Sequence, residues 1–392
     1  MKHVATTLQP ITLQSITLHR IAMPLVRPFE TSFGRQTVRV VLLVHVRSVD
    51  GAEGWAECVA GESPRYSSEY VDGCEHVIRH YLAPALLSAH GVTADNIHTL
   101  MGFVVGHRMA KAALEAAVLD TQLRASNRSF VDFLGGTMEQ PGPLAVWVDC
   151  GVSVGISPDL DTLLAEVSVY VDAGYRRIKL KIKPGWDLEP VAAVRELLGP
   201  DALLQVDANT AYGLADLDHL RELDTFGLVL IEQPFVEEDI ATHVLLSRHI
   251  QTPVCLDESI VSAMVATDAL ARGATSVINV KPGRVGGYRE SVLIHDLCRA
   301  QGVPVWCGGM LETGIGRAAN VALAALPGFT LPGDTSASDR YFAEDLVEEP
   351  FVLGSGEHRG QLRVPTGPGT GVSVRADLVR DWAVAAPLKL KR

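Results

Sequence analysis

The stretch from Arg177 to Lys281 decides the fold of this 392-residue chain. It contains five short apolar segments that each end in an ionisable residue: Arg177-Ile-Lys-Leu-Lys181, Leu203-Leu-Gln-Val-Asp207, Leu228-Val-Leu-Ile-Glu232, Val254-Cys-Leu-Asp257 and Ser276-Val-Ile-Asn-Val-Lys281. From Lys181 onward, these end residues follow one another at steps of 26, 25, 25 and 24 residues. One strand, one helix and two short loops take about 25 residues, so the regular step predicts repeating strand–helix units.

Similar apolar segments lie on both sides of this stretch, at 146–156, 303–306 and 329–331, and helical patterns such as 159–173 and 188–198 lie between the strands. Near-continuous apolar strands that alternate with helices indicate a parallel sheet buried on both faces. About eight such units over about 200 residues close best as an α/β barrel of the TIM type. The alternative is an open doubly wound sheet, which would need a glycine-rich phosphate loop, and Gly151-Val-Ser-Val-Gly155 matches such a loop poorly.

The N-terminal third of the chain has a different pattern. Strand-like segments at 16–24, 38–46 and 54–59 are followed by helical segments at 68–87, 94–105 and 106–125. Strands followed by helices without alternation indicate a small α+β domain. We therefore expect a loose extension over residues 1–14, the α+β domain over 15–140 and the barrel over 141–354. The end of the chain, 355–392, is expected to return to the α+β domain and complete it.

The bulk composition excludes several classes of protein. With 47% apolar and 20% charged residues the chain can form a large core, and the net charge of −12 argues against a nucleic-acid partner. The sequence lacks an apolar run long enough for a transmembrane helix, and its first residues lack the apolar centre of a signal peptide. Six cysteines are scattered singly. We therefore expect reduced, buried thiols and a cytoplasmic location without membrane contact. We also expect a homo-oligomer.

Three of the five segments end in a carboxylate: Asp207, Glu232 and Asp257. In a barrel the C-terminal ends of the strands surround an open mouth, so acids from three successive strands are expected to converge. Carboxylates in one place repel each other, and a divalent cation would stabilise them. Oxygen ligands alone favour Mg²⁺, with Mn²⁺ as the alternative, over Zn²⁺. A simpler interpretation is that each acid caps the helix that follows its strand.

Lysines flank the three acids in the sequence. Lys179 and Lys181 are two residues apart in one strand, so both side chains are expected to point into the barrel. Lys281 follows a strand on the opposite side of the ring. A lysine beside a divalent ion and other cations has a lowered pKa and can act as a base near neutral pH. We therefore expect proton transfer on two faces of one substrate. Alternatively, Lys281 only forms an ion pair with Asp257 or Glu258.

The motifs around these residues resemble those of the enolase superfamily, specifically its muconate-lactonising branch. The matching pieces are Lys179-x-Lys181, Asp207-x-Asn209, Glu232-Gln-Pro234, Asp257-Glu-Ser259 and Lys281. Longer segments are similar to the o-succinylbenzoate synthase / N-acylamino acid racemase family: Arg177-Ile-Lys-Leu-Lys-Ile-Lys-Pro-Gly-Trp186, Lys281-Pro-Gly-Arg-Val-Gly-Gly287, Trp306-Cys-Gly-Gly-Met-Leu-Glu-Thr-Gly-Ile-Gly-Arg317 and Leu331-Pro-Gly-Asp-Thr335.

The resemblance implies a modified (β/α)7β barrel with a capping domain, formed by the N-terminal segment and the end of the chain. Loops of the cap, near 28–34 and 58–66, would close over the barrel mouth. The family pattern implies these site residues: Mg²⁺ ligands Asp207, Glu232 and Asp257, the acid/base pair Lys181 and Lys281, and Lys179 as a cation near the substrate carboxylate. Further residues are expected to bind the substrate: Ser153, Asn209, Gly309, Met310 and Leu311.

The resemblance also implies an enzyme that removes the proton α to the carboxylate of a small molecule. One reaction is the dehydration of 2-succinyl-6-hydroxy-2,4-cyclohexadiene-1-carboxylate to o-succinylbenzoate in menaquinone biosynthesis, in which Lys181 would perform both steps. The other is the racemisation of N-succinylamino acids and other N-acylamino acids, in which Lys181 and Lys281 would act on opposite faces. Arg284 is expected to keep Lys281 deprotonated by like-charge repulsion, with Glu258 as a supporting residue.

Other activities are alternatives to this interpretation. Muconate cycloisomerase and dipeptide epimerase belong to the same superfamily, but the epimerases typically carry Asp-x-Asp at the eighth strand. This chain has Gly333-Asp-Thr-Ser336 there. A lyase that forms a Schiff base through Lys281 is a further alternative from a different class of enzyme.

Overall fold

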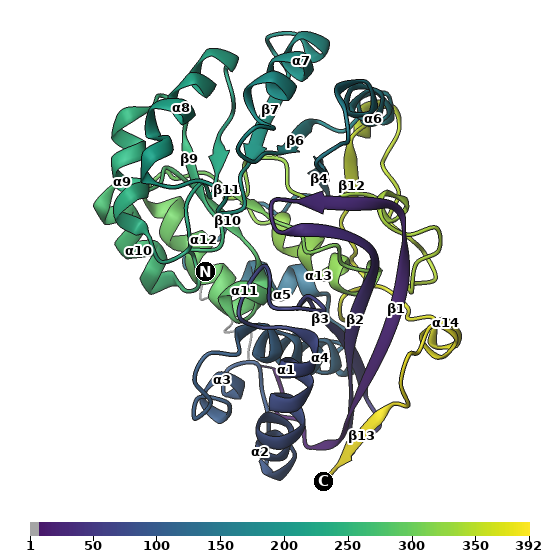
Figure 1. Ribbon diagram of the computed structural model, residues 1–392. Helices are drawn as coiled ribbons and strands as arrows, with labels where there is room; N and C mark the ends of the chain where they lie inside the picture. The colour runs from purple at the N-terminus through teal and green to yellow at the C-terminus, as the bar shows by residue number, and fades with distance from the viewer. Residues whose placement is uncertain (1–7) are drawn as a thin grey trace.

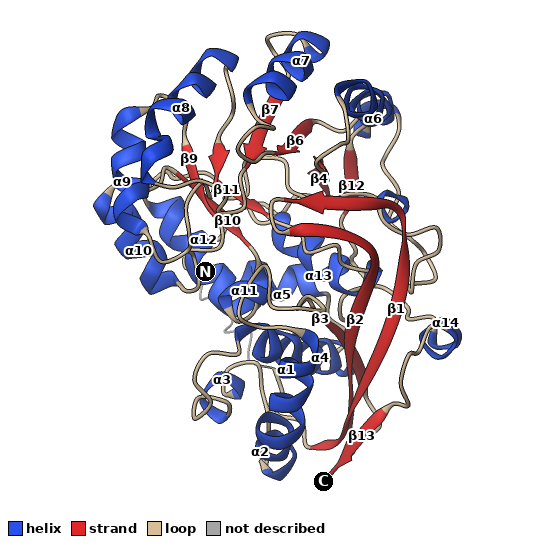
Figure 2. Cartoon of the chain, in the orientation of Figure 1, coloured by secondary structure: helices blue, strands red, loops and turns tan. Residues whose placement is uncertain are grey.

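The computed structural model describes residues 8–392, which form a barrel and a capping part (Figures 1 and 2). The first half of the expected extension, residues 1–7, lies outside the described residues. A seven-stranded sheet has the order β11-β10-β9-β8-β7-β6-β5, and a four-stranded sheet has the order β13-β1-β2-β3. In Figure 2 helices surround the first sheet, while the long strands of the second lie beside it.

All neighbouring strands of the larger sheet are parallel. The strands are β5 (Gly151–Val154), β6 (Arg177–Lys181), β7 (Leu203–Asp207), β8 (Ile231–Glu232), β9 (Val254–Leu256), β10 (Val277–Val280) and β11 (Val305–Cys307). The eighth predicted segment forms single bridges, Phe329 to Val305 and Gly333 to Cys150. These bridges connect the last strand to the first, so the sheet closes as the predicted barrel and the doubly wound alternative is wrong.

Helices follow the barrel strands: α6 (Leu160–Ala173), α7 (Leu188–Leu198), α8 (Leu217–Arg221), α9 (Ile240–His249), α10 (Ala263–Arg272), α11 (Pro282–Val285), α12 (Tyr288–Ala300) and α13 (Gly314–Ala324). Local chemistry sets the bounds of several of them. Helix α6 begins after Asp159, whose side chain accepts a hydrogen bond from the Thr162 amide at 2.8 Å. It ends at Gly174, which has the left-handed φ of 98° that glycine adopts readily.

The capping part contains β1 (Leu13–Thr31), β2 (Gly34–Ser48), β3 (Glu53–Cys58), α1 (Val71–Val77), α2 (Ala83–Ser88), α3 (Ile97–Leu100), α4 (Arg108–Ala125) and α5 (Phe130–Thr137). A π-helical turn, Ile78–Leu82, joins α1 to α2 in place of the single predicted helix. Helix α5 was not predicted, because two glycines near its end weaken the helical pattern. The helix begins after Ser129, whose hydroxyl accepts a hydrogen bond from the Asp132 amide.

Strand β2 is buried on both faces. Leu42 and Val44 belong to the main core together with Leu114 of α4, whereas Val41 and Leu43 pack in a second cluster with residues of the chain's last third. Alternate side chains of a strand point to opposite faces. The capping sheet therefore lies between its own helices and segments that follow the barrel strands.

The β1–β2 hairpin is longer than its sequence pattern predicts. The strands were expected at 16–24 and 38–46, but they pair as far as Thr31 and Gly34, with a register shift between Pro24 and Phe29. The outer part carries polar residues without apolar alternation, so the pattern is lost there. Figure 1 shows the hairpin reaching from the capping part across the barrel. Segment 28–34 is therefore mostly strand, with its turn at the tip.

The end of the chain contributes to both parts. Strand β13 (Leu388–Lys391) pairs with β1, and β12 (Gln361–Arg363) pairs with β4 (Trp147–Asp149). Helix α14 (Ala376–Asp381) lies between them in the sequence. Residues 8–14 pack with the cap, because Leu8 and Ile11 are buried and Ile11 exchanges hydrogen bonds with Val92. We propose the expected boundaries, 15–140, 141–354 and 355–392, with residues 8–14 added to the cap.

None of the helices in residues 8–392 combines the length and the apolar character needed to span a bilayer. All six cysteines are buried and free, in agreement with the prediction from their spacing.

Candidate active site

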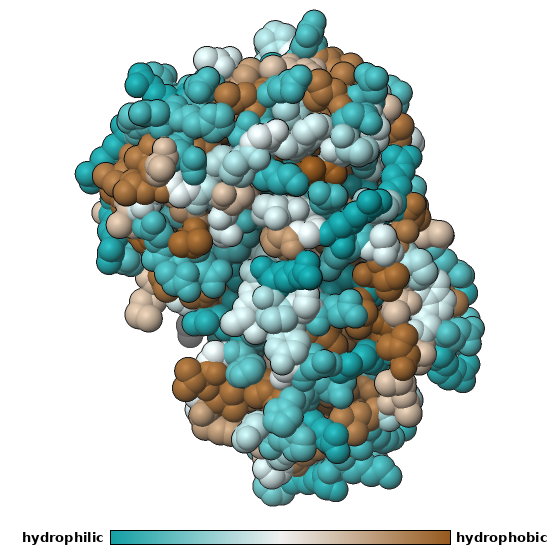
Figure 3. All heavy atoms as spheres, viewed as in Figure 1, coloured by the Kyte–Doolittle hydropathy of each residue, from teal (hydrophilic) through white to brown (hydrophobic). Residues whose placement is uncertain are grey.

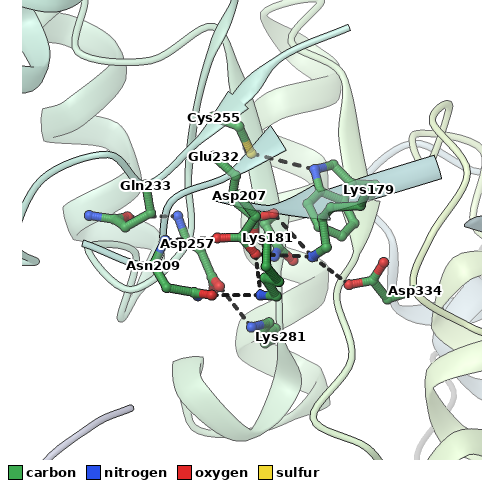
Figure 4. A network of polar contacts seen from close by, with 12 residues as sticks. Lys179, Lys181, Asp207, Asn209, Glu232, Gln233, Cys255, Asp257, Lys281 and Asp334 are labelled. Atoms are coloured by element: carbon green, nitrogen blue, oxygen red, sulfur yellow. Dashed lines mark hydrogen bonds and ion pairs between the residues drawn. The ribbon is translucent and has the colours of Figure 1, made fainter. Parts of the chain in front are cut away.

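Six ionisable residues meet at the carboxyl ends of the barrel strands (Figure 4). Lys179 and Lys181 lie in strand β6, Asp207 ends β7 and Glu232 ends β8. Asp257 directly follows β9, and Lys281 directly follows β10. The parallel register places Lys181 opposite Asp207, and Asp207 opposite Glu232. Each of the six is at most 8% exposed. The structure therefore brings together all the charged residues that the sequence pattern singled out.

Lys181 is bound by oxygen acceptors. Its Nζ donates to Asp207 Oδ2 at 2.6 Å and to Asn209 Oδ1 at 2.7 Å, and Asn209 Nδ2 donates to Glu258 Oε1 at 3.0 Å. Burial lowers the pKa of Lys181, Asp207 partly offsets this effect, and the nearby Lys179 adds to it. A buried lysine with a lowered pKa is suited to serve as a general base.

Lys281 has a different environment. Its Nζ contacts Asp257 Oδ2 at 2.7 Å and donates to the Tyr66 hydroxyl at 3.1 Å, and the Tyr66 hydroxyl donates to Asp257 Oδ1 at 3.2 Å. Burial alone would lower the pKa of Lys281, but Tyr66, Glu232 and Glu258 outweigh it and raise the pKa. Lys281 is therefore protonated near neutral pH in this structure and suited to donate a proton.

Arg284 lies beside Asp257, the acid that Lys281 also contacts. The Arg284 guanidinium contacts Asp257 Oδ1, and its Nε donates to the Ile260 carbonyl at 2.7 Å. Tyr66, Glu232 and Glu258 raise the pKa of Lys281, and the effect of Arg284 on Lys281 stays a prediction. Arg284 fixes the position of the carboxylate that Lys281 contacts.

Lys179 forms a buried network with acids of three strands. Its Nζ lies 2.6 Å from Asp334 Oδ2, 3.1 Å from Glu232 Oε2 and 3.3 Å from Asp207 Oδ2. Arg177 holds the other oxygen of Asp334 at 2.9 Å. Burial alone would lower the pKa of Lys179, but the three carboxylates raise it well above its ordinary value. Lys179 is therefore a permanent cation at the floor of the site.

Sequence reasoning missed three residues of this site: Tyr66, Asp334 and Trp306. Tyr66 lay in a loop expected near the mouth, but only the fold places it on Lys281. Asp334 appeared only within a family motif and as an argument against the dipeptide epimerases. The Trp306 ring lies 4.7 Å from Lys179 Nζ, a cation–π distance, and one aromatic residue in a strand reads as ordinary core.

The acids offer only oxygen atoms, the donors that Mg²⁺ prefers. Within residues 8–392, however, no three His, Cys, Asp or Glu side chains are grouped as a ready metal site. Lysine or arginine groups contact each of the three acids. Asp207 and Glu232 do share one cation, Lys179 Nζ. Burial and the nearby Asp207 raise the pKa of Glu232, which reflects two close carboxylates. These features fit a divalent cation held between neighbouring strands.

A cavity of about 250 Å³ opens onto the lysines. All five residues expected to bind the substrate line it: Ser153, Asn209, Gly309, Met310 and Leu311. The two expected cap segments, 28–34 and 58–66, line it as well. The Ser153 hydroxyl is buried and has no hydrogen-bond partner in residues 8–392, so it is free to bind a ligand. The Ser32 hydroxyl at the hairpin tip donates to the Asn209 carbonyl at 2.9 Å.

The loops around this cavity hold strained backbone. Asn209, Thr210, Gln233 and Leu311 have positive φ values of 40°, 64°, 39° and 57°. Such conformations are unfavourable for residues other than glycine and are enriched at functional sites. Here they occur within four residues of the ends of β7, β8 and β11, where the side chains of the site are positioned.

Family models match both parts of the chain. The model "Enolase C-terminal domain-like" matches residues 162–378, and "Mandelate racemase / muconate lactonizing enzyme, N-terminal domain" matches residues 15–135. An N-succinylamino acid racemase from Amycolatopsis sp. is 58% identical, over 95% of this chain and 98% of that protein. An o-succinylbenzoate synthase from Geobacillus kaustophilus is 43% identical, over 96% of this chain and 98% of that protein.

Crystal structures agree with these sequence matches. An enolase-superfamily member from Listeria innocua has a TM-score of 0.90 and 36% identity, covering 97% of this chain and 99% of that one. The muconate lactonizing enzyme from Pseudomonas putida has a TM-score of 0.83 and 26% identity, covering 95% and 99%. The predicted (β/α)7β-type barrel with an α+β cap is confirmed, and the chain belongs to the mandelate racemase / muconate lactonizing enzyme family of the enolase superfamily.

Proposed function

We propose that the protein enolises a small-molecule carboxylate, as an o-succinylbenzoate synthase with N-succinylamino acid racemase activity. The observation that carries the proposal is the pair of lysines at one cavity: Lys181 on β6 and Lys281 after β10, with three strands between them. Relatives named for both activities match nearly the whole chain. A muconate cycloisomerase from Rhodococcus opacus is 28% identical, which makes it the more distant alternative.

The acids at the strand ends fit Mg²⁺, which enolase-superfamily members generally use. We propose Asp207, Glu232 and Asp257 as its ligands, with Mn²⁺ as a substitute. When bound, the ion would supply positive charge to the carboxylate oxygens of the substrate as the α-proton leaves. The lysines that contact these acids would then have fewer anionic partners, and Lys179 would keep Asp334.

For racemisation, the contrast between the two catalytic lysines sets their roles. Lys181, with its lowered pKa, takes the α-proton of one enantiomer on its Nζ. The carbanion formed at the α-carbon is delocalised into the carboxylate, beside the Lys179 cation. Lys281, with its raised pKa, donates a proton from Nζ to the opposite face of that carbon. This turnover leaves Lys181 protonated and Lys281 neutral, which is the state that removes the α-proton of the opposite enantiomer from the other face.

For the dehydration, one lysine suffices. Lys181 takes the α-proton and then gives it to the departing hydroxyl, which leaves as water. The loss of water makes the ring aromatic. Lys281 keeps its proton and lies over the anionic intermediate as a cation. Tyr66 and Asp257 hold Lys281 in place.

The contacts argue against two other activities. Both oxygens of Asp334 are engaged by Arg177 and Lys179, so this acid is not available to bind the free ammonium group of a dipeptide. A Schiff-base mechanism needs a free lysine nucleophile, whereas Lys281 Nζ is held by Asp257 and Tyr66. A cytoplasmic location and a homo-oligomer stay predictions from the sequence.

The proposal is tested by hydrogen exchange. Purified protein with Mg²⁺ is expected to exchange the α-proton of an N-succinylamino acid with solvent in D₂O, followed by NMR, and Lys181→Ala is expected to abolish the exchange from one enantiomer. Dehydration is followed by the ultraviolet absorbance of o-succinylbenzoate. Absence of both reactions, or exchange that survives in the Lys181→Ala, Lys281→Ala double variant, would refute the assignment.

A further inference from the structure

The cavity above the site is lined by more cations than anions, although the chain has a net charge of −12. The ionisable residues that line it are the cations Arg35, Arg39, Arg65, Lys179, Lys181 and Lys281 and the anions Glu62 and Asp334. Such a concentration of positive charge in an acidic protein favours an anionic ligand. The question is which of these cations are free to bind one.

Four of the cations already have partners. The three lysines contact the acids of the site. Arg39 is buried, and its guanidinium donates to the carbonyls of Val40, Val59 and Ala60. By contrast, neither Arg35 nor Arg65 forms an ion pair with any residue in the range 8–392. The hydrogen bond from Arg65 Nη1 to the Phe33 carbonyl, 3.3 Å long, leaves most of the guanidinium donors free.

The two free arginines lie on the cap at the outer end of the cavity. Arg35 follows the tip of the β1–β2 hairpin, and Arg65 lies in the loop after β3; both side chains are exposed, whereas the three lysines are nearly buried. The bond from Arg65 to Phe33 joins the two cap segments. Hydrophilic residues gather where the hairpin end meets the barrel in Figure 3.

Uncharged side chains complete the wall of the cavity, among them Phe29, Val59 and Met310. Cations at the buried end and cations at the exposed end, with apolar side chains in the same cavity, match a ligand that carries two carboxylates. The buried carboxylate is the one at which the reaction takes place. The outer one would be separated from it by a short, mostly uncharged chain.

We infer that Arg35 and Arg65 bind the terminal carboxylate of the substrate's succinyl group and make the enzyme selective for succinyl over uncharged acyl groups. The inference rests on the proposed function, because both proposed substrates carry a succinyl group. The guanidinium groups offer paired N–H donors that fit a carboxylate. The unpartnered Ser153 hydroxyl, deeper in the cavity, donates to the carbonyl oxygen that links the succinyl group to the rest of the substrate.

The test compares two substrates that differ only in the outer carboxylate, an N-succinylamino acid and the N-acetyl derivative of the same amino acid. The variants are Arg35→Met, Arg65→Met and the double variant, because methionine keeps the apolar stem and removes the charge. Arg27→Met is the matched control: Arg27 is an exposed arginine of the same hairpin that lines a neighbouring groove but not this cavity.

We expect the double variant to lower the ratio of kcat/KM for the succinyl over the acetyl substrate by about 10-fold or more, as for a partly exposed charge-assisted contact. Arg27→Met is expected to change the ratio by less than about 2-fold. Added salt should lower the ratio in the wild type but not in the double variant. Equal loss for both substrates, or an unchanged ratio, would overturn the inference.

A binding measurement separates this inference from the proposed function. Calorimetry measures the binding of N-succinylglycine and of N-acetylglycine in the presence of Mg²⁺. Because glycine is not chiral, no net racemisation accompanies the binding. Weaker binding of only the succinyl compound by the double variant supports the role of the arginines, even where no α-proton exchange is observed. Exchange from both acyl substrates without any difference between wild type and variant rejects the arginines and leaves the proposed function standing.

Discussion

Replacing the buried Glu57 by glutamine is predicted to change how the stability of the protein depends on pH. Glu57 lies in β3 of the cap, and its Oε2 accepts hydrogen bonds from the Thr313 amide at 2.9 Å and the Thr313 hydroxyl at 2.8 Å. Arg39 is 3.9 Å from the other oxygen, which has no hydrogen-bond partner in residues 8–392. The residue therefore joins the cap to the start of α13 in the barrel.

Burial raises the pKa of Glu57 from 4.5 to about 7; Arg39 opposes this effect, and Glu312 adds to it. A carboxyl group whose pKa is raised by folding binds more protons in the folded state between these two values. Its stabilising contribution is therefore complete below the unfolded pKa and is lost as the pH rises through the folded pKa. Each pH unit corresponds to about 1.36 kcal/mol, so between pH 5 and pH 8 the loss is about 2.5 kcal/mol.

Glutamine has the shape of the protonated acid, and its carbonyl oxygen accepts both Thr313 hydrogen bonds, but it does not titrate. For a chain of this length, about 2.5 kcal/mol corresponds to about 3 °C in Tm. We expect the difference in Tm, Glu57→Gln minus wild type, to be about 3 °C larger at pH 8 than at pH 5 when unfolding is monitored by circular dichroism. The exposed Glu196→Gln is the control. A Tm difference that does not change with pH would refute the reasoning.

Three other predictions concern the site itself. Asp334→Asn removes the shared partner of two buried cations and is expected to lower the free energy of unfolding by about 3 kcal/mol, or Tm by about 4 °C. Replacement of the exposed Asp201 by asparagine is expected to leave Tm unchanged in the same thermal scan. Tyr66→Phe removes the hydroxyl between Lys281 and Asp257, and we expect about a 10-fold loss of kcat for racemisation with an unchanged circular dichroism spectrum; full activity would contradict a role in holding Lys281. Mg²⁺ at about 100 times its Kd is expected to stabilise the wild type by about 2.7 kcal/mol, or about 3 °C in Tm, and to have little effect on the Tm of Asp207→Asn. Equal Tm shifts in both proteins would place the metal elsewhere.

The two catalytic lysines show why chemistry inferred from residue types needs the surrounding contacts. The sequence pattern treats Lys181 and Lys281 as a symmetrical pair, and both were expected to have lowered pKa values. In the structure Lys181 keeps that property, whereas Tyr66 and nearby carboxylates raise the pKa of Lys281. Arg284, which was expected to repel Lys281, forms an ion pair with Asp257. The asymmetry depends on a cap residue distant in the sequence, which no local pattern reveals.

The predictable parts of the fold are those with strong local periodicity. Segment 188–198 was predicted within its observed bounds, and the strands that carry the acids were placed to within a few residues. The outer half of the β1–β2 hairpin was missed, since its polar residues do not alternate with apolar ones. The eighth barrel strand was predicted as a regular strand, but Phe329 and Gly333 make only single bridges.

The sequence by itself determined the barrel, the positions of its strand ends and the set of charged residues delivered there, because parallel strands require apolar segments at a regular spacing. Only the tertiary structure decided which of those charges meet, and which atoms neutralise them. Asp334 contacts Lys179 across more than 150 residues, and Tyr66 reaches Lys281 across 215. Contacts of this kind depend on chain closure and burial, which act on the folded molecule as a whole and leave no periodic pattern in the sequence.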